Sequence, residues 1–412
     1  MKIWKEKYEA SRRKVKVYFL EIIVAISLFI MAFVMMSYLK IKGCGLAAAS
    51  ILIIASGFLS IAFHISPSIL EFLAGLYASV IGIKPFLELK VISHLALIFL
   101  FFIIGTEIDY YVLKNHTNKI HIPLLVFFPS FIGTFILLHL VFHLNSIGAL
   151  FIALALSTSS TDAIKTVLVE RGYDVIYVGE IMYFSAMVID IIAILILSLI
   201  LTGYNIVGLL YPILIILMLV IAPRTIARLQ RKYHIFEFEI KLLAFLLISL
   251  YVILEAIGLH APLLAFIFGL TLSESIRKHE LLERRLKGMA LGLFTPILFF
   301  TSGLLTNISL LFRMKIIKII LLTAFISLLI QFLTAYIPLK VYLQKLNLRR
   351  FPLIYAFKIT HAIPILYIVH TMSIIDNMLY NIGVICILIH ILAFIIPHKM
   401  LPHPIIVEEI KV

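Results

Sequence analysis

Charge is scarce in this sequence. Only 14% of its 412 residues are Asp, Glu, Lys or Arg, whereas a soluble globular domain carries about 25%. Hydrophobic residues make up 63%, which is more apolar surface than a water-soluble fold can bury. Cysteine is almost absent as well, because Cys44 and Cys386 offer neither a disulfide framework nor a metal-ligand spacing. These shortages exclude a soluble domain and a disulfide-stapled scaffold, and they indicate a protein whose solvent is lipid.

Long apolar runs fill most of the chain instead. Runs of about 17–25 residues recur along it, the length that spans a bilayer as a helix, and strand-like alternation is lacking. We therefore predict an all-α integral membrane protein with about 14 transmembrane helices. The predicted helices begin near residues 17, 44, 68, 93, 121, 147, 178, 206, 237, 260, 290, 314, 351 and 378. The longest connection, about residues 273–288, is predicted to be an amphipathic connector at the cytoplasmic surface.

The placement of the basic residues predicts the orientation. The net charge of +14 is concentrated in short segments between apolar runs, so it indicates membrane topology and not nucleic-acid binding. Basic segments precede the first helix and follow predicted helices 8, 10 and 12, whereas the loops after helices 5, 7 and 9 lack Lys and Arg. The positive-inside rule then puts both termini in the cytoplasm, for a multi-pass protein of the cell (inner or plasma) membrane.

One acidic residue lies where lipid makes charge costly. Asp190 is near the middle of the predicted seventh helix, with apolar residues on both sides. A charge at that depth costs roughly 2.5–3.5 kcal/mol on insertion scales and usually marks a pathway or a relay. A carboxyl group in a partly dehydrated cavity can alternate between binding a proton and binding a cation. The alternative is a neutral carboxylic acid that is hydrogen-bonded to a neighbouring helix.

Two predicted helices carry signs of interruption. Residues 157–162 place six hydroxyl or carboxyl side chains in a row inside helix 6, including Ser159, Ser160, Thr161 and Asp162. Such side chains compete for their own backbone and favour a break, although a polar but continuous helix remains the alternative. Helix 13 holds Lys358 and then His361 and Pro364, which read as a second interruption. Two interrupted segments in corresponding halves indicate a binding site near the bilayer midplane.

Four short stretches resemble the monovalent cation:proton antiporter superfamily, closest to its bacterial and archaeal sodium/proton and potassium-efflux branch. They occur in the family's order, at residues 66–76 (Ser-Pro-Ser-Ile-Leu-Glu-Phe-Leu-Ala-Gly-Leu), 105–109 (Gly-Thr-Glu-Ile-Asp), 263–270 (Leu-Leu-Ala-Phe-Ile-Phe-Gly-Leu) and 296–304 (Pro-Ile-Leu-Phe-Phe-Thr-Ser-Gly-Leu). The resemblance covers about residue 44 onward and leaves the first helix as an extra.

The resemblance implies an inverted-repeat sodium/proton antiporter fold with two crossed broken helices, and a homodimer. It divides the chain into a basic cytoplasmic N-terminus with an extra first helix (1–43), a first inverted repeat (44–205), a linking helix with a basic cytoplasmic loop (206–236) and a second inverted repeat (237–412). Thr161 and Asp162 match the Thr-Asp of the first broken helix, and Asp190 matches the ion-binding Asp. These residues are the expected ligands of Na⁺ or K⁺ and of the proton, with Ser159 and Ser160 in support.

Two positions depart from the family pattern. Ile189 stands where electrogenic members have a second Asp, and Gln331 stands where a basic residue is usual. Both changes remove charge from the site, which suggests electroneutral exchange of one cation per proton. Lys358 is a candidate to restore the missing positive charge by pairing with Asp190 or Asp162.

The predicted function is therefore exchange of a monovalent cation for H⁺, with Na⁺ preferred and with no cofactor beyond the transported Na⁺ (or K⁺ or Li⁺) and H⁺. A K⁺/H⁺ antiporter and an orphan transporter of the same fold remain alternatives. An integral-membrane enzyme is the alternative from another class, although the longest connection has a single His279 and no ligand spacing.

Overall fold

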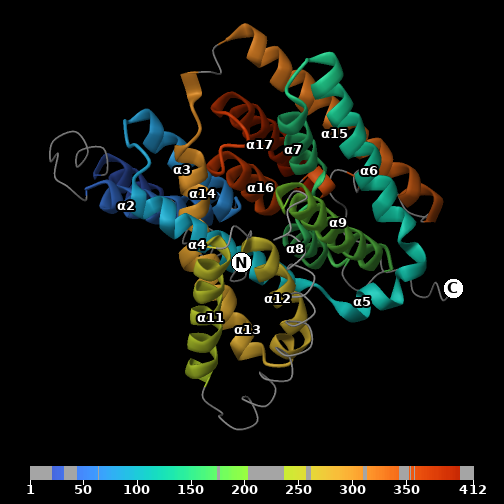
Figure 1. Ribbon diagram of the computed structural model, residues 1–412, viewed down its shortest axis with the longest axis horizontal. Helices are drawn as coiled ribbons and strands as arrows, with labels where there is room; N and C mark the ends of the chain where they lie inside the picture. The colour runs from blue at the N-terminus through green and yellow to red at the C-terminus, as the bar shows by residue number, and fades with distance from the viewer. Residues whose placement is uncertain are drawn as a thin grey trace, which may run out of the picture. The chain divides into compact units, whose positions relative to one another are not determined.

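The computed structural model describes residues 21–31, 44–63, 65–173, 177–202, 236–256, 261–309, 313–342, 352, 354–356 and 358–399. Within these ranges every regular element is helical (Figure 1). The α-helices are α2 (Cys44–Phe63), α3 (Pro67–Val80), α4 (Leu87–Glu107), α5 (Tyr110–Asn115), α6 (His121–Ile136), α7 (Ser146–Ser157), α8 (Thr161–Arg171), α9 (Tyr177–Thr202), α11 (Phe236–Ala256), α12 (Ala261–Arg277), α13 (Glu280–Met289), α14 (Thr295–Leu304), α15 (Met314–Tyr342), α16 (Ile359–Thr371) and α17 (Asn377–Lys399). Residues 21–31 are also helical. Short 3₁₀ or π turns are η2 (Thr117–Lys119), η3 (Leu137–Val141) and η5 (Ala290–Phe294).

Six helical stretches of the described chain are long and apolar enough to cross a membrane. They are Gly45–Phe63, Leu87–Glu107, Thr117–Val141, Tyr177–Leu201, Glu280–Leu304 and Met314–Pro338. Shorter apolar helices cover Glu21–Met31, Pro67–Val80, Ser146–Ser157 and Asn377–Ala393. Most predicted starts agree with observed starts within a few residues, and this confirms an all-helical, multi-pass architecture for the described part. The predicted helix near residue 206 lies outside the described residues.

The connector predicted at residues 273–288 is amphipathic, with Leu282 and Leu286 buried, but it is mostly helical and not a loop. Helix α12 continues to Arg277, and α13 then joins α14 through the π turn η5, so the stretch Glu280–Leu304 is helical throughout. Glu, Leu, Arg and Lys dominate α13 and are all strong helix formers. An exposed i,i+4 pair between Glu280 and Arg284, 2.5 Å apart, adds to its helical preference.

The chain divides into two compact units, and the first comprises residues up to Leu100 together with Lys287–Ile308. In this unit α3 packs along α14, and α2 packs against α3 (Figure 1). Glycine permits the contact between α3 and α14: a Cβ on Gly75 would lie 1.8 Å from the Phe300 carbonyl oxygen, and one on Gly303 would lie 2.0 Å from the Phe72 carbonyl oxygen. The two backbones therefore touch directly, as small residues allow between membrane helices.

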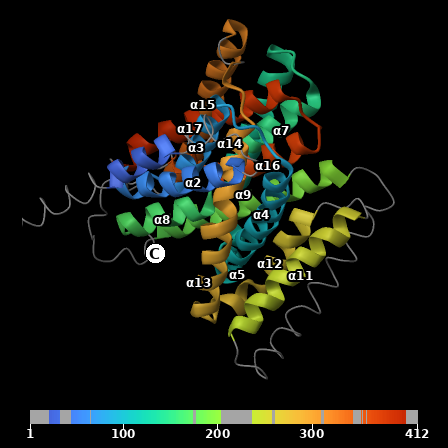
Figure 2. The same cartoon turned by 90° about the vertical axis from the view of Figure 1, so that its left-hand side faces the viewer.

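The second unit comprises Phe101–Leu286 and Ser309–Val412. Here α6 packs against α15 and α7, while α7 also contacts α16 and α17; Figure 2 shows α11 beside α12. A second glycine contact occurs in this unit, between the end of α4 and α12. A Cβ on Gly105 would lie 2.1 Å from the Phe266 carbonyl oxygen, and one on Gly269 would lie 2.0 Å from the Phe102 carbonyl oxygen.

Polar side chains fix where several helices of the second unit begin. Asn145 accepts a hydrogen bond from the Ile147 amide at the start of α7, and Asp376 accepts one from the Leu379 amide at the start of α17. These are the residue types that cap helix N-termini, because their side chains satisfy amides that lack a helical partner. A polar side-chain cap of the same kind starts α8, the helix at the candidate site.

Candidate ion-binding site

The first predicted interruption is present between α7 and α8. Thr158 and Ser160 have extended backbone angles (φ −70°, ψ 168° and φ −109°, ψ 105°), and Ser160 caps α8 by accepting from the Ala163 amide at 3.4 Å. The residues from Ser157 to Thr161 are all buried. A run of hydroxyl side chains thus ends one half-helix and starts another inside the protein, which confirms the prediction of a broken helix.

The second interruption lies at Lys358, earlier than the predicted stretch that ran on to Pro364. Lys358 is not helical (φ −144°, ψ 9°), and its carbonyl accepts from the amides of His361 (3.2 Å) and Ala362 (2.8 Å) to open α16. Pro364 lies inside α16 and does not end it. The predicted start of this helix at 351 is also wrong, since residues 354–356 form a 3₁₀ turn and α16 begins at Ile359.

The two interruptions touch each other. The hydroxyl groups of Ser160 and Thr360 are 2.6 Å apart, and α7 packs against α16. Ser160 caps α8, and Thr360 is the second residue of α16. The N-terminal ends of two half-helices therefore meet, and each carries partial positive charge from its unpaired amides.

Asp190 on α9 lies at this meeting point. Its carboxylate is fully buried, and Oδ2 accepts a hydrogen bond from the Thr161 hydroxyl and is 3.3 Å from His361 Nε2. Within the described chain, Oδ1 has no hydrogen-bond partner. Since a buried polar atom without a partner is rare and costly, this oxygen is a candidate ligand position.

Lys358 and Gln331 lie on the other side of the first interruption. Both are buried, and Lys358 Nζ donates to the Leu156 carbonyl and, over 2.8 Å, to Gln331 Oε1. Gln331 Nε2 donates in turn to the Thr158 carbonyl at 3.4 Å. The two side chains thus satisfy carbonyls at the C-terminal end of α7, which lack helical partners. These contacts differ from the predicted pairing of Lys358 with Asp190, whose close basic neighbour is His361.

The other predicted site residues divide into two groups. Thr161 contacts Asp190 directly, and Ser160 is linked to it through Thr360 and His361, while Ser159 is buried close by with a hydroxyl that has no partner in the described chain. Asp162 is the second residue of α8, and its side chain is outside the described part. Sequence reasoning named His361 as part of the interruption but did not assign it to the ion site. Its position three residues after Lys358 in an apolar run was the available signal.

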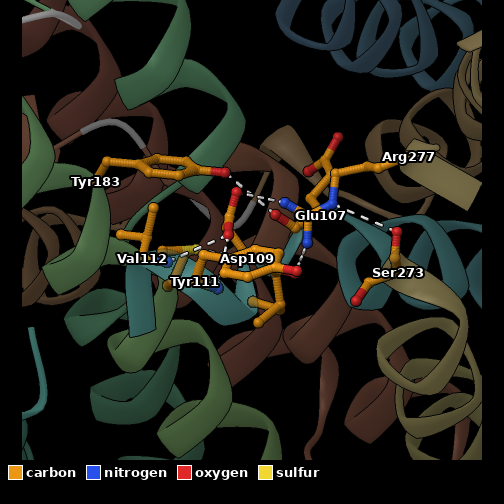
Figure 3. A network of polar contacts seen from close by, with 9 residues as sticks. Glu107, Asp109, Tyr111, Val112, Tyr183, Ser273 and Arg277 are labelled. Atoms are coloured by element: carbon orange, nitrogen blue, oxygen red, sulfur yellow. Dashed lines mark hydrogen bonds and ion pairs between the residues drawn. The ribbon is translucent and has the colours of Figure 1, made fainter. Parts of the chain in front are cut away.

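A polar network connects α9 with the ends of α4 and α12 (Figure 3). Arg277 donates to Asp109 Oδ2 and to the Ile108 carbonyl, both at 2.5 Å, and the Tyr183 hydroxyl donates to the Glu107 carbonyl at 3.1 Å. Asp109 also caps α5. The ends of α4 and α12 are thereby tied together, and Tyr183 ties α9 to α4 two turns before Asp190. Glu107 is close enough to Asp190 to act on it electrostatically.

A cavity of about 600 Å³ lies at the opposite ends of the half-helices, where α7 begins and α16 ends. The polar residues that line it are His143, Asn145, His370, Ser373, Asp376 and Asn377. Asp190 does not line it and is fully buried. The carboxylate is therefore closed off from this cavity in the conformation described.

Comparisons with known proteins agree with this geometry. A family model described as "Sodium/hydrogen exchanger, transmembrane" matches residues 45–398. The "Probable Na(+)/H(+) antiporter 3" of Methanocaldococcus jannaschii is 27% identical over 266 residues, which are 61% of this chain and 68% of that protein. The structure of the sodium proton antiporter MjNhaP1 from the same organism matches with a TM-score of 0.62 at 13% identity, over 86% of this chain and 98% of that one, and so shares the fold. These matches confirm the superfamily resemblance, and the chain belongs to the sodium/hydrogen exchanger family of transmembrane proteins.

Proposed function

We propose that this chain is a secondary antiporter that exchanges a monovalent cation for H⁺ at Asp190. The observation that carries the proposal is the environment of that carboxylate: it is fully buried, one oxygen is bonded to Thr161, and the other has no partner in the described chain. A single carboxylate at the N-terminal ends of two half-helices can hold a proton or a cation, but not both, and that competition couples the two fluxes.

The ligands proposed for the cation are Asp190, the hydroxyl of Thr161 and carbonyl groups freed by the interruption, with Asp162 added from the family pattern. Carboxylate, hydroxyl and carbonyl oxygens are hard ligands that suit alkali cations. Na⁺ is proposed as the preferred substrate because the relatives above are named as a sodium proton antiporter and a probable Na⁺/H⁺ antiporter. K⁺ or Li⁺ would use the same oxygens, so a K⁺/H⁺ antiporter is the alternative.

Exchange is proposed to be electroneutral. Ile189 is apolar where electrogenic members have a second Asp, and Gln331 is uncharged and is bonded to Lys358 and to the Thr158 carbonyl. If Asp190 alone changes its occupant, one cation replaces one proton, and the site has the same net charge in both states.

The architecture proposed is about 14 spans, with residues 44–205 and 237–412 as inverted repeats that contribute one broken helix each. The two glycine contacts described above support it. All four glycines stand in the same Phe-x-x-Gly pattern, and each faces the carbonyl of the partner helix's Phe; the pattern occurs at Phe72–Gly75, Phe102–Gly105, Phe266–Gly269 and Phe300–Gly303. In the proposed repeats α3 corresponds to α12 and α4 to α14, so each contact joins one helix of the first repeat to one of the second, as expected of inverted repeats.

The remaining parts of the proposal concern placement. Residues 1–43 are proposed as a basic cytoplasmic segment with an extra first helix, and residues 206–236 as a linking helix with a cytoplasmic loop. The protein is proposed to be a homodimer of the cell membrane with both termini in the cytoplasm. The basic segments of the sequence support this orientation.

The test measures exchange in proteoliposomes that carry a preset proton gradient. The signal is the dequenching of a pH dye when a cation is added. Na⁺, Li⁺ and K⁺ are compared, with and without valinomycin to clamp the voltage. The wild type should respond to Na⁺ regardless of the clamp, and Asp190→Asn should abolish the response. Glu280→Gln is the matched control, because Glu280 is exposed on α13 and its surface pair with Arg284 contributes little.

Each outcome bears on a different part of the proposal. Exchange that survives in Asp190→Asn would rule out Asp190 as the site. A response that depends on the clamp would exclude electroneutral exchange. No response to any of the three cations in the wild type would leave an orphan transporter of the same fold.

A further inference from the structure

Lys165 of α8 places its ammonium group over an aromatic ring of α9. Its Nζ lies 5.4 Å from the centroid of the Tyr183 ring. Within about 6 Å, a lysine ammonium is attracted by the electron-rich face of an aromatic ring. The ring face therefore already holds one monovalent cation, although the exchange mechanism given above assigns no role to either side chain.

This contact lies on the same helix faces as the ion site. Lys165 follows Thr161 by four residues on α8, and Tyr183 precedes Asp190 by seven residues on α9. Residues four or seven apart share one face of an α-helix, and α8 packs against α9. The Thr161–Asp190 bond and the Lys165–Tyr183 contact are thus successive contacts of one interface, about 6–10 Å apart along the helices.

Burial increases from one contact to the other. Lys165 is exposed and Tyr183 is partly buried, whereas Thr161 and Asp190 are buried. Between them on α9 lies Met187, which is fully buried and whose sulfur accepts from the Asp109 amide at 3.3 Å. The interface of α8 and α9 therefore leads from the surface to the carboxylate, and Met187 closes it in the conformation described. In the topology proposed above, it opens on the cytoplasmic side.

The ring of Tyr183 is held in place from its far end. Its hydroxyl donates to the Glu107 carbonyl at 3.1 Å, so the ring is anchored to α4 while Lys165 of α8 lies over its face (Figure 3). The Glu107 side chain acts electrostatically on Asp190, and its negative charge favours a cation along the same interface. A fixed aromatic face beside an acidic group suits a small monovalent cation.

We propose that the face of Tyr183 is a transit site for the transported monovalent cation on its way to Asp190, and that the Lys165 ammonium occupies this site as a tethered competitor. The inference rests on the proposed function and names residues that set the apparent affinity for the cation. Lysine suits this role, because its ammonium is a compact cation on a flexible stem that cannot itself be carried across.

The scheme makes cation entry depend on the release of Lys165. An entering cation takes the place of the ammonium over the ring, Met187 moves aside, and the cation passes to Asp190. Only molecules whose Lys165 has left the ring accept a cation, so the apparent affinity is the intrinsic affinity reduced by the fraction in that state. Removing the competitor should therefore strengthen apparent affinity and change the maximal rate far less.

The first experiment compares Lys165→Gln with the wild type in the proteoliposome assay. Cation–π contacts at exposed sites correspond to roughly a two- to fivefold change in an equilibrium. The Na⁺ concentration for half-maximal dequenching should fall by that factor in Lys165→Gln and stay near the wild-type value in Lys165→Arg, which keeps a cation over the ring. Lys114→Gln removes an exposed charge from the neighbouring helix α5 and is the matched control. It should leave the half-maximal concentration unchanged.

A double-variant cycle separates occupancy of the ring from a general effect of charge. Tyr183→Phe keeps the ring and loses only the hydroxyl, so adding Lys165→Gln should still lower the half-maximal concentration. Tyr183→Leu removes the ring, so adding Lys165→Gln should have no further effect. An equal fall in the leucine background would show that Lys165 acts only through its field, and it would overturn the inference.

A second measurement leaves both residues unchanged. An amine-reactive reagent at low dose labels exposed lysines of the purified protein, and mass spectrometry gives the rate at Lys165 with and without Na⁺. Labelling of Lys165 should be faster in Na⁺ for the wild type but not for Asp190→Asn at the same salt concentration, while Lys114 in the same samples should not respond. A rate at Lys165 that ignores Na⁺, or that responds equally in Asp190→Asn, would overturn the inference.

The outcomes distinguish this inference from the proposed function. If Lys165→Gln has the half-maximal concentration of the wild type, the transit site is overturned, while antiport at Asp190 stands. If Asp190→Asn exchanges Na⁺ normally, the proposed function fails instead, whatever Lys165→Gln does.

Discussion

Replacing Gly269 with alanine should destabilise the packing of α12 against α4 through a single added carbon. A Cβ at this position would lie 2.0 Å from the Phe102 carbonyl oxygen, far inside van der Waals contact. The obstacle is backbone, which cannot rotate away as a side chain can, so the helices must separate by more than 1 Å or so. Overpacking of this kind costs about 1–3 kcal/mol even where side chains can adjust, and the separation also forfeits dispersion contacts along the interface.

The stability cost of the backbone contact alone can be isolated with a control glycine that faces open space. A Cβ on Gly57, inside α2, would meet no atom of the described chain within 4 Å. Gly57→Ala should therefore be neutral or stabilising, by up to about 1 kcal/mol from helix propensity. The two substitutions are chemically identical and both lie inside helices, so the difference in their effects reports the contact alone.

Thermal unfolding of the detergent-solubilised protein, followed by fluorescence-detected size-exclusion chromatography after heating, measures both variants. Gly269→Ala should lower the midpoint, and Gly105→Ala, Gly75→Ala and Gly303→Ala should lower it comparably, since their Cβ distances are 1.8–2.1 Å. If Gly269→Ala were as stable as Gly57→Ala, direct backbone contact between α4 and α12 would be refuted.

Two further predictions concern the interruption itself. Thr161→Val removes the hydroxyl that donates to Asp190. Because a hydrogen bond to a charged group contributes about 1.5–3 kcal/mol, half-maximal dequenching should need roughly 10- to 100-fold more Na⁺. Thr161→Ser keeps a hydroxyl and should retain most of the wild-type affinity. Lys358→Met leaves the Leu156 carbonyl and Gln331 without their donor and should lower thermal stability by about 1–3 kcal/mol. Adding Gln331→Leu to Lys358→Met should lower stability further in the same heating assay, because the Thr158 carbonyl then loses its donor as well; a full recovery would contradict the assigned contacts.

Much of the helical layout follows from the sequence, for a simple physical reason. Each lipid-crossing helix must be predominantly apolar, so hydropathy alone predicts the starts of α9 and α15 to within a residue or so. The break before α8 was equally accessible, because Ser157 to Asp162 are residues that compete with helical hydrogen bonding. These features depend on local composition, which a single sequence contains.

Other features depend on contacts that composition does not contain. Pro364 was expected to extend the second interruption, but it is tolerated inside α16, where the missing amide hydrogen bond falls near the start of the helix. The polarity of residues 273–288 predicts a connector, although these residues are good helix formers. A search for apolar runs therefore finds membrane-spanning helices and misses polar helices such as α13.

The candidate site shows the same limit. Asp190 and Thr161 were found because their residue types are costly in lipid or break a helix, but their mutual hydrogen bond joins α8 to α9 and could not be derived from spacing. His361 was missed for that reason: its significance comes from its approach to Asp190 on another helix. The sequence also suggested that Lys358 pairs with Asp190, which would have been reasonable on charge alone.

The geometry of the first interruption explains why Lys358 and Asp190 have different roles. Between the end of α7 and the start of α8 lie only three residues, 158–160, so carbonyls without partners and amides without partners are close neighbours. The Lys358 amino group donates to the Leu156 carbonyl, and the Gln331 amide donates to the Thr158 carbonyl. These contacts connect the end of α7 to α15 and to the residue before α16. On the amide side lies Asp190, which has one carboxylate oxygen hydrogen-bonded to Thr161 and the other without a partner in the described chain. The carbonyls of Leu156 and Thr158 are thus bonded by the protein, whereas on the amide side a carboxylate oxygen has room for a ligand, and it is there that we propose the exchange of a proton and a cation.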